Sequence, residues 1–323
     1  KVKLAISCNV PEKNIISAPD IESIYDVPIN FEMDKIGSKL LKSLGLNAKN
    51  KIDLKEWKDF VLKSKNAKKK LNIAIAGKYF DTGNFVLSDS YISVIEAIKI
   101  SSYVLGVKPT LTWLNSKDFD KATRKLNSLK KFDGVIVPGG FGESGVDGKI
   151  NIIKYVRENK IRFLGLCYGM QLAVIEYARN VLGVKDANTV EINPNTANPI
   201  IDVMPEQKKK LEKNDYGGTM RLGSYPAVLM EGTISRKAYG VDEINERHRH
   251  RYEVNPEYIQ KLEDGGIIFS GKSPDDRLME IMELSPKKHP FFVGTQFHPE
   301  FKAQPLSPHP LFTEFIKVCG GKK

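Results

Sequence analysis

The sequence predicts an α/β fold in which helices cover both faces of an open, mostly parallel β-sheet. From Leu71 onward, short apolar runs typical of buried strands alternate with longer segments that carry apolar residues at helical spacing. Repeated βα units of this length favour parallel strands, because each helix returns the chain to the same end of the sheet. In addition, 41% of the 323 residues are hydrophobic, so the chain can bury a sizeable core.

Each element of this region is expected from its local pattern. The apolar run 71–76 ends at Gly77 and predicts a buried strand, and the apolar residues spaced through 89–105 predict a long core helix. The same reasoning predicts strands at 109–114, 134–137 and 162–166, and helices at 118–129, 149–159 and 170–181. The segment 188–215 is rich in Asn, Pro and Lys and is long for a connection, so we interpret it as a lid or ordered functional loop. Short strand-like runs follow near 219–222, 227–230, 267–270, 278–284 and 291–296, with a last helix at 310–318.

Residues 1–70 follow a different pattern. The segment 2–8 is alternating and apolar, a helix is expected from Ile21 to just before Pro28, and further helices are expected over 34–46 and 53–63. These elements are too few to close a core alone. The lysine-rich run 63–70 marks a boundary, so we expect an appended segment, 1–70, and one domain, 71–323. Because the chain starts on Lys1 rather than Met, we expect it to be a piece of a longer protein.

Charge and composition limit the possible functions. The formal net charge is +11, and residues 1–70 contribute +6 of it. We interpret the lysine run as a solvated linker, with a phosphate-contacting segment as the alternative, and we do not expect nucleic-acid binding. No apolar stretch reaches the ~18 residues of a membrane span, and no signal peptide begins the chain, so a cytoplasmic protein is expected. The cysteines, Cys8, Cys167 and Cys319, are too widely separated for a disulfide framework or a zinc cluster.

The sharpest motif is Gly165-Leu-Cys-Tyr-Gly169, at the point where a predicted strand gives way to a helix. Small flanking residues permit the strained turn of a nucleophile elbow, and the helix N-terminus favours a thiolate at Cys167. The alternative is a buried cysteine that acts only as a small hydrophobic residue, which is how we interpret Cys8 and Cys319.

A cysteine nucleophile needs a base, and His298 follows the predicted strand 291–296 within Gln-Phe-His-Pro-Glu. Glu300, two residues on, could orient the ring and stabilise an imidazolium. The string Arg-His-Arg-His-Arg-Tyr at 247–252 predicts an alternating strand with cationic groups on one face, suited to an anionic ligand or merely solvated. Pro-Gly-Gly-Phe-Gly at 138–142 follows another strand and could offer backbone N–H groups to an oxyanion, or could be an ordinary turn.

Together these residues resemble the class I (triad) glutamine amidotransferases, and further strings narrow the resemblance to the CTP synthase family. The family resemblance implies a flavodoxin-like sheet for 71–323, and it makes 1–70 the C-terminal tail of a synthetase domain with its linker. The strings that carry it are Val-Asp-Gly-Lys-Ile at 146–150, Gly-Gly-Thr-Met-Arg-Leu-Gly at 217–223, Arg-His-Arg-His-Arg-Tyr-Glu-Val-Asn at 247–255, Gln-Phe-His-Pro-Glu-Phe at 296–301, Cys-Asn-Val-Pro-Glu at 8–12 and Ile-Tyr-Asp-Val-Pro at 24–28.

The resemblance implies roles for individual residues. Cys167 would attack the side-chain amide of L-glutamine, with His298 shuttling protons and Glu300 orienting it. The N–H groups of Gly139 and Tyr168 would stabilise the oxyanion. The positions that match those holding glutamine in the family are Gln171, Glu191 and Arg251.

The resemblance also implies that ammonia passes to a synthetase domain that aminates UTP to CTP with ATP and Mg²⁺. Lys3 matches a position near the UTP phosphates, and the ATP and metal sites are expected upstream of Lys1. No cofactor or metal is expected within this chain, and the family assembles as a homo-tetramer. Phe141, Thr219 and Arg221 match positions implicated in activation by GTP. Two residues depart from the family pattern. Ser144 stands where the family usually has an Arg associated with the GTP response, so the resemblance does not imply activation by GTP through this loop. Tyr168 replaces the Leu that the family usually has beside the nucleophile.

Three alternatives remain open at this point. The chain could serve another synthetase, such as GMP synthase, although the N-terminal tail argues against it. It could be a non-catalytic assembly module. It could also bind nucleic acid through its positive charge, which would make its association strongly salt-dependent.

Overall fold

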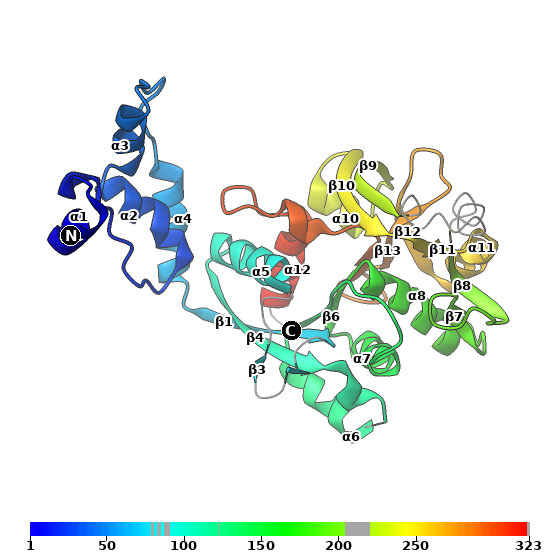
Figure 1. Ribbon diagram of the computed structural model, residues 1–323. Helices are drawn as coiled ribbons and strands as arrows, with labels where there is room; N and C mark the ends of the chain where they lie inside the picture. The colour runs from blue at the N-terminus through cyan, green and yellow to red at the C-terminus, as the bar shows by residue number, and fades with distance from the viewer. Residues whose placement is uncertain (79–80, 83–84, 87–90, 122, 204–219, 322–323) are drawn as a thin grey trace. The chain divides into compact units, whose positions relative to one another are not determined.

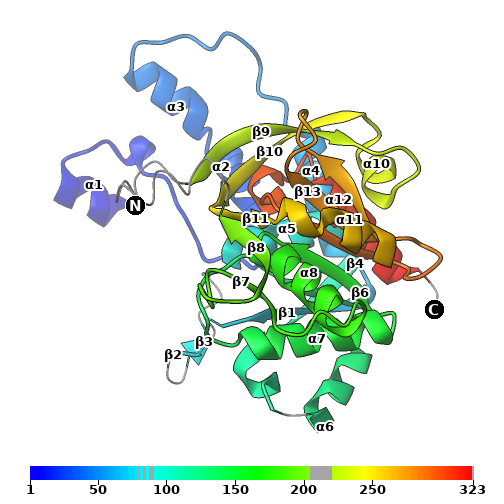
Figure 2. The same cartoon turned by 90° about the vertical axis from the view of Figure 1, so that its right-hand side faces the viewer.

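The computed structural model describes residues 1–321 except 79–80, 83–84, 87–90, 122 and 204–219. The chain divides into two compact units, Lys1–Ala67 and Lys68–Lys323, and each is described by itself (Figures 1 and 2). In the described part of the chain, no helix has both the length and the apolar character needed to cross a membrane.

The first unit is helical. Its α-helices are α1 (Val2–Cys8), α2 (Val27–Met33), α3 (Ile36–Ser43) and α4 (Lys55–Asn66), with short 3₁₀ turns η1 (Glu12–Asn14) and η2 (Ile24–Asp26). An aromatic contact joins its two ends, since the Tyr25 and Phe60 rings meet edge to face with centroids 5.0 Å apart. The Trp57 indole N–H also donates to the Tyr25 carbonyl at 2.8 Å.

The segment 2–8, whose apolar residues alternate, forms a helix, and none of its residues is buried. One expectation for this unit needs correction. The helix expected to end before Pro28 instead begins there, since α2 carries Pro28 in its first turn. Proline fits that position because its fixed φ suits a helix and its missing N–H would have no partner there.

The second unit is built on a nine-stranded sheet in the order β10-β9-β12-β13-β14-β6-β5-β1-β4. Its parallel half contains β4 (Val107–Asn115), β1 (Lys69–Gly77), β5 (Gly134–Val137), β6 (Arg162–Leu166) and β14 (Phe292–Thr295). Taken in chain order, these five strands lie 2-1-3-4-5, which is the flavodoxin-like order. The antiparallel half contains β13 (Met279–Leu284), β12 (Ile267–Lys272), β9 (Arg221–Leu229) and β10 (Glu243–His250).

Helices cover both faces of this sheet, and strand β1 shows how. Ile73 and Ile75 pack into one buried cluster with α5 (Ile92–Val104) and α12 (Pro310–Gly320), whereas Ala74 and Ala76 pack into a second with α7 (Val146–Glu158) and α8 (Tyr168–Asn180). Alternate residues of a strand face opposite ways, so the two clusters lie on opposite faces. The predicted α/β fold class is therefore confirmed.

The helix predicted over 118–129 is broken into three pieces, η4 (Ser116–Phe119), α6 (Thr123–Leu126) and η5 (Asn127–Lys131). Contacts with α7 explain the break. The Asn151 amide donates to the carbonyls of Phe119 and Asp120, and the Asp120 carboxylate accepts from the Gly148 N–H. The carbonyls of Phe119 and Asp120 therefore accept hydrogen bonds from α7, and the predicted helix is interrupted at this point.

The remaining elements lie outside the nine-stranded sheet. A small sheet has the order β11-β8-β7, and a two-stranded one pairs β2 with β3. Their bounds are β2 (Asp81–Thr82), β3 (Phe85–Val86), β7 (Ala187–Thr189), β8 (Asn198–Val203) and β11 (Tyr252–Val254), and the other helices are α10 (Ile234–Tyr239), α11 (Pro256–Gly265) and η7 (Pro299–Lys302). The segment 188–215, expected to be a lid or functional loop, contributes the end of β7 and all of β8, and its part from 204 onward lies outside the described residues.

Candidate active site

Cys167 lies in a strained turn between β6 and α8. Its φ is 50° and its ψ is −99°, a conformation that L-residues rarely adopt. Two glycines allow the turn. A Cβ on Gly169 would lie 2.0 Å from the Val137 carbonyl oxygen, and one on Gly165 would lie 2.8 Å from the backbone of Gly169. The predicted elbow geometry is therefore present, with its glycines required by close backbone packing.

His298 and Glu300 follow strand β14, which is hydrogen-bonded to β6 in parallel register. His298 Nδ1 and Glu300 Oε1 are 2.8 Å apart, and the imidazole stacks on Phe301 with centroids 4.9 Å apart. Burial lowers the pKa of His298, but hydrogen bonding and charge from Cys167 and Glu300 outweigh burial and raise this pKa to about 10. The geometry thus brings a thiol, an imidazole and a carboxylate into one chain of contacts and favours an imidazolium beside Cys167.

The loop 138–142 packs against this pair. A Cβ on Gly139 would lie 2.8 Å from Cε1 of His298 and 3.7 Å from Cβ of Cys167, so only glycine fits there without a shift. Tyr168 holds this loop in place. Its side chain is buried, and its hydroxyl donates a hydrogen bond to the Gly142 carbonyl at 2.9 Å. The tyrosine beside the nucleophile therefore contributes its side chain, which the sequence analysis did not expect.

A cavity of about 530 Å³ opens above Cys167 and His298. Its lining includes each residue expected to hold glutamine, Gln171, Glu191 and Arg251, together with Gly139. Glu191 accepts a hydrogen bond from the Gly142 N–H at 2.9 Å, and burial raises the pKa of its carboxyl against the opposing effects of that bond and of Lys78, Arg251 and Lys149. A carboxyl and a guanidinium therefore face one cavity, as an amino-acid ligand requires.

The string 247–252 alternates as expected. His248 and His250 are buried, and His250 also contributes to the cavity wall, which Arg249, Arg251 and Tyr252 line as well. Burial lowers the pKa of His248 to about 2 and that of His250 to about 3, so both rings are neutral at pH 7 and the cationic face consists of arginines. A large cavity beside this face favours ligand binding over simple solvation.

Gln296 contacts the nucleophile, and the sequence analysis assigned it no role. Its amide nitrogen lies 3.7 Å from Cys167 Sγ, and its amide oxygen accepts from Gln171 Nε2 at 3.2 Å. Gln171 Nε2 also donates to the Tyr252 carbonyl at 2.9 Å. The signal was available, since alternation along the strand end turns Gln296 and His298 to the same side.

The residues matched to the GTP response are separated by the structure. Phe141 is 68% exposed at the mouth of the cavity, whereas Arg221 is 8% exposed and pairs with Glu280. Thr219 lies outside the described residues. Ser144 is exposed, and Lys3 is exposed on α1 in the other unit.

Comparison with known proteins identifies the family. The model of the glutamine amidotransferase class-I family matches residues 86–318. The chain belongs to the class I glutamine amidotransferase family.

Within this amidotransferase family, the chain is similar to proteins named CTP synthase. It is 50% identical over 317 residues to that of Caldanaerobacter subterraneus, covering 98% of this chain and 57% of the relative. It is 47% identical over 326 residues to that of Methanocaldococcus jannaschii, covering 99% and 58%. The chain therefore spans a little over half the length of these relatives.

A solved structure supports the same family assignment. The glutaminase domain of Trypanosoma brucei CTPS, solved with bound acivicin, superposes with a TM-score of 0.71 and 32% identity. The match covers 78% of this chain and 95% of that domain. The predicted family is therefore confirmed.

Proposed function

We propose that residues 71–323 hydrolyse L-glutamine as the glutaminase part of a CTP synthase. The observation that carries the proposal is the contact chain from Cys167 through His298 to Glu300 at the floor of a cavity. The proposal is supported by the elbow geometry at Cys167, which places the buried thiol at the wall of the cavity.

The thiolate of Cys167 attacks the side-chain amide carbon of glutamine, so that a C–S bond forms and negative charge develops on the oxygen. The N–H groups of Gly139 and Tyr168 stabilise this charge; as the first residue of α8, Tyr168 has an N–H without an intrahelical partner. His298 then donates its proton to the nitrogen, the C–N bond breaks, and ammonia leaves. Water, deprotonated by His298, hydrolyses the γ-glutamyl thioester to glutamate and restores the thiol, while Glu300 keeps the ring oriented.

Glutamine is held by groups matched to its charges. Arg251 pairs with the α-carboxylate and Glu191 with the α-ammonium, and both line the cavity. Gln171, which is 2% exposed, orders the cavity wall through its bonds to Tyr252 and Gln296.

In the whole protein, we propose that the ammonia aminates UTP to CTP with ATP and Mg²⁺, as the names of the relatives suggest. Residues 1–70 then belong to the end of the synthetase domain and its linker, with Lys3 near the UTP phosphates. The described residues hold no group of three or more His, Cys, Asp or Glu side chains suited to a metal ion, so these residues do not form a Mg²⁺ site.

The remaining proposals concern regulation and assembly. We propose a cytoplasmic homo-tetramer without nucleic-acid partners. GTP would act at the cavity mouth through the exposed Phe141 ring, without the loop arginine of the family, since Ser144 stands in its place. Thr219, matched to the same response, lies outside the described residues. Since Arg221 is buried in ion pairs, its part in a GTP response would be indirect.

The test is ammonia release from glutamine, compared between the chain and its Cys167→Ser variant. Labelling of Cys167 by acivicin, followed by mass spectrometry of the peptide, reports on the nucleophile without the rest of the enzyme. Labelling that is lost with excess glutamine supports the proposal. An unlabelled Cys167 together with no ammonia release would favour the non-catalytic assembly module.

A further inference from the structure

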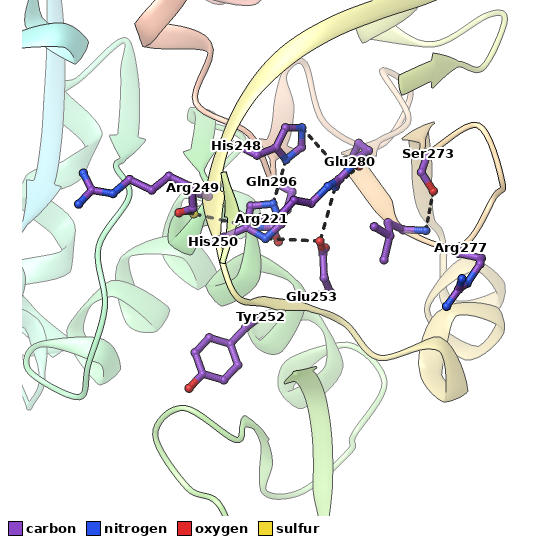
Figure 3. A network of polar contacts seen from close by, with 12 residues as sticks. Arg221, His248, Arg249, His250, Tyr252, Glu253, Ser273, Arg277, Glu280 and Gln296 are labelled. Carbon is purple, nitrogen blue, oxygen red and sulfur yellow. Dashed lines mark hydrogen bonds and ion pairs between the residues drawn. The ribbon is translucent and has the colours of Figure 1, made fainter. Parts of the chain in front are cut away.

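The side chain of Gln296 is buried against the proposed nucleophile, and the reaction above assigns it no step. Gln296 is 0% exposed, and its amide nitrogen donates a hydrogen bond to Cys167 Sγ over 3.7 Å. The residue lies beside the segment 249–252 (Figure 3), because Cys167 and Gln171 each contact both. Gln296 is therefore a polar group that touches the atom proposed to attack.

Backbone hydrogen bonds fix the position from which this amide extends. The Cys167 N–H donates to the Thr295 carbonyl at 2.6 Å, so the elbow is bonded to the residue that precedes Gln296. The Gln296 N–H donates to the Glu280 carbonyl of β13 at 2.8 Å. Strands β13, β14 and β6 are neighbours in the sheet, so the sheet sets the distance between the amide and the thiol.

Hydrogen bonds also decide which end of the amide faces the thiol. The Tyr252 carbonyl can only accept, and it receives one N–H from Gln171 Nε2 at 2.9 Å. The second N–H of Gln171 donates to Gln296 Oε1 at 3.2 Å. Turning the Gln296 amide over would set two NH₂ groups against each other and would put an oxygen beside the sulfur. The chain from Tyr252 through Gln171 therefore leaves the N–H end of Gln296 for Cys167.

This contact favours the ionised form of Cys167. A neutral thiol can donate to the Arg249 carbonyl, which lies 4.0 Å from Sγ. A thiolate cannot donate to that oxygen, and it accepts instead from Gln296 and from His298, which also hydrogen-bonds the sulfur. Hydrogen bonds to an ionised acceptor are stronger than those to a neutral one, so the Gln296 N–H stabilises the thiolate more than the thiol.

The two donors to the sulfur differ in what they do during the proposed reaction. His298 gives its proton to the leaving nitrogen, whereas the amide N–H of Gln296 does not titrate and transfers no proton. When water attacks the thioester and the C–S bond breaks, the electron pair returns to the sulfur, which again accepts from Gln296. The amide donor is thus available in both halves of the reaction.

We propose that Gln296 is a further catalytic residue whose side-chain N–H stabilises the Cys167 thiolate, and that Gln171 and the Tyr252 carbonyl keep this N–H turned toward the sulfur. Gln296 touches the reacting atom, whereas Gln171 acts through Gln296 as a positioning residue. The inference rests on the proposed role of Cys167 as nucleophile.

The test measures the rate of Cys167 alkylation by iodoacetamide against pH in the full chain, by peptide mass spectrometry, because the thiolate is the reactive form. In Gln296→Met a side chain of similar length has no N–H, so we expect the midpoint of this profile to rise by about one pH unit. Exposed Cys8 provides an internal control, because its profile should not change.

Two further variants show whether the effect is specific. Thr295→Val removes the neighbouring buried hydroxyl, which donates to the Phe297 carbonyl at 3.0 Å, and its Cys167 midpoint should stay at the wild-type value. Gln171→Met leaves the Gln296 amide free to turn, so the midpoint should rise by less than in Gln296→Met. The double variant Gln171→Met/Gln296→Met should match Gln296→Met alone, because Gln171 acts through Gln296.

Different results separate this inference from the proposed function. An unchanged midpoint in Gln296→Met, or an equal rise in Thr295→Val, shows that the Gln296 N–H does not stabilise the thiolate. A double variant with a larger rise than Gln296→Met contradicts the positioning role of Gln171. If urea unfolding shows that Gln296→Met is not folded, Gln171→Met decides, since an unchanged midpoint there contradicts the inference. If wild-type Cys167 alkylates with the profile of Cys8, the proposed function itself loses its activated nucleophile.

Discussion

Replacing Gly139 by alanine is expected to disable glutamine hydrolysis while leaving the domain folded. The new Cβ would lie 2.8 Å from Cε1 of His298, well inside the 3.4 Å at which ordinary contact begins. The ring cannot easily retreat, because Glu300 holds its Nδ1 at 2.8 Å and Phe301 stacks on it. A misplacement on the order of 1 Å between reacting groups can cost about 10²-fold in rate, so we expect kcat to fall about 10–100-fold.

The adjacent glycine provides a matched control for this prediction. A Cβ on Gly140 would meet Lys149 Nζ and Tyr168 Cδ1 at 3.8 Å, which is ordinary contact. Neither glycine has a positive φ, so backbone strain does not differ between the variants, and both keep the N–H. Ammonia release should therefore fall in Gly139→Ala and remain near wild type in Gly140→Ala, with urea unfolding confirming that both fold. A Gly139→Ala enzyme within twofold of wild type, or an equal loss in both variants, would refute the reasoning.

Three further predictions follow from buried or charged groups. Glu191→Gln can still accept from the Gly142 N–H but no longer pairs with the substrate ammonium, so we expect KM for glutamine to rise about tenfold with little change in kcat; steady-state kinetics that show only a lower kcat would contradict this. Arg157→Met leaves Glu176 buried without its bidentate partner at 2.8 Å and should cost about 3 kcal/mol in urea unfolding, whereas Arg157→Met/Glu176→Leu should recover most of the loss; equal midpoints for the single and double variants would count against it. Burial lowers the pKa of His289 from 6.5 to about 4, so the unfolded chain takes up the proton first and stability falls as pH drops from about 6.5 to about 4. Over this range His289→Gln should lose less stability than wild type, by up to about 1.4 kcal/mol per pH unit, and identical slopes in urea unfolding between pH 7 and pH 5 would overturn the assignment.

Local patterns predicted most of the parallel half of the second unit. Strands β5 and β6 have the bounds expected from their apolar runs, and α7 and α8 begin three and two residues before the predicted starts. These elements could be predicted because a buried strand or core helix has a regular pattern of apolar residues along the sequence. Pro28 and the broken helix near Asp120 could not be predicted in the same way, because capping and contacts with α7 decide them.

The sequence by itself determined the chemical groups of the candidate site. Cys167 between two glycines, and His298 followed by Glu300, are local motifs whose spacing along the chain already implies their chemistry. Their contact depends on the sheet, because β14 reaches β6 from more than a hundred residues away and sets the two strand ends side by side.

Only the tertiary structure decided what surrounds these groups. It places the Gln296 amide 3.7 Å from the Cys167 thiol, puts the Tyr168 hydroxyl under the Gly142 carbonyl, and buries Arg221 among carboxyl groups. It also shows that alternation in β10 buries His248 and His250, whose ring nitrogens lie 2.9 Å apart, and leaves Arg249 exposed at the cavity. The physical reason is that burial and long-range pairing set these contacts and charges, and neither is recorded in the spacing of nearby residues.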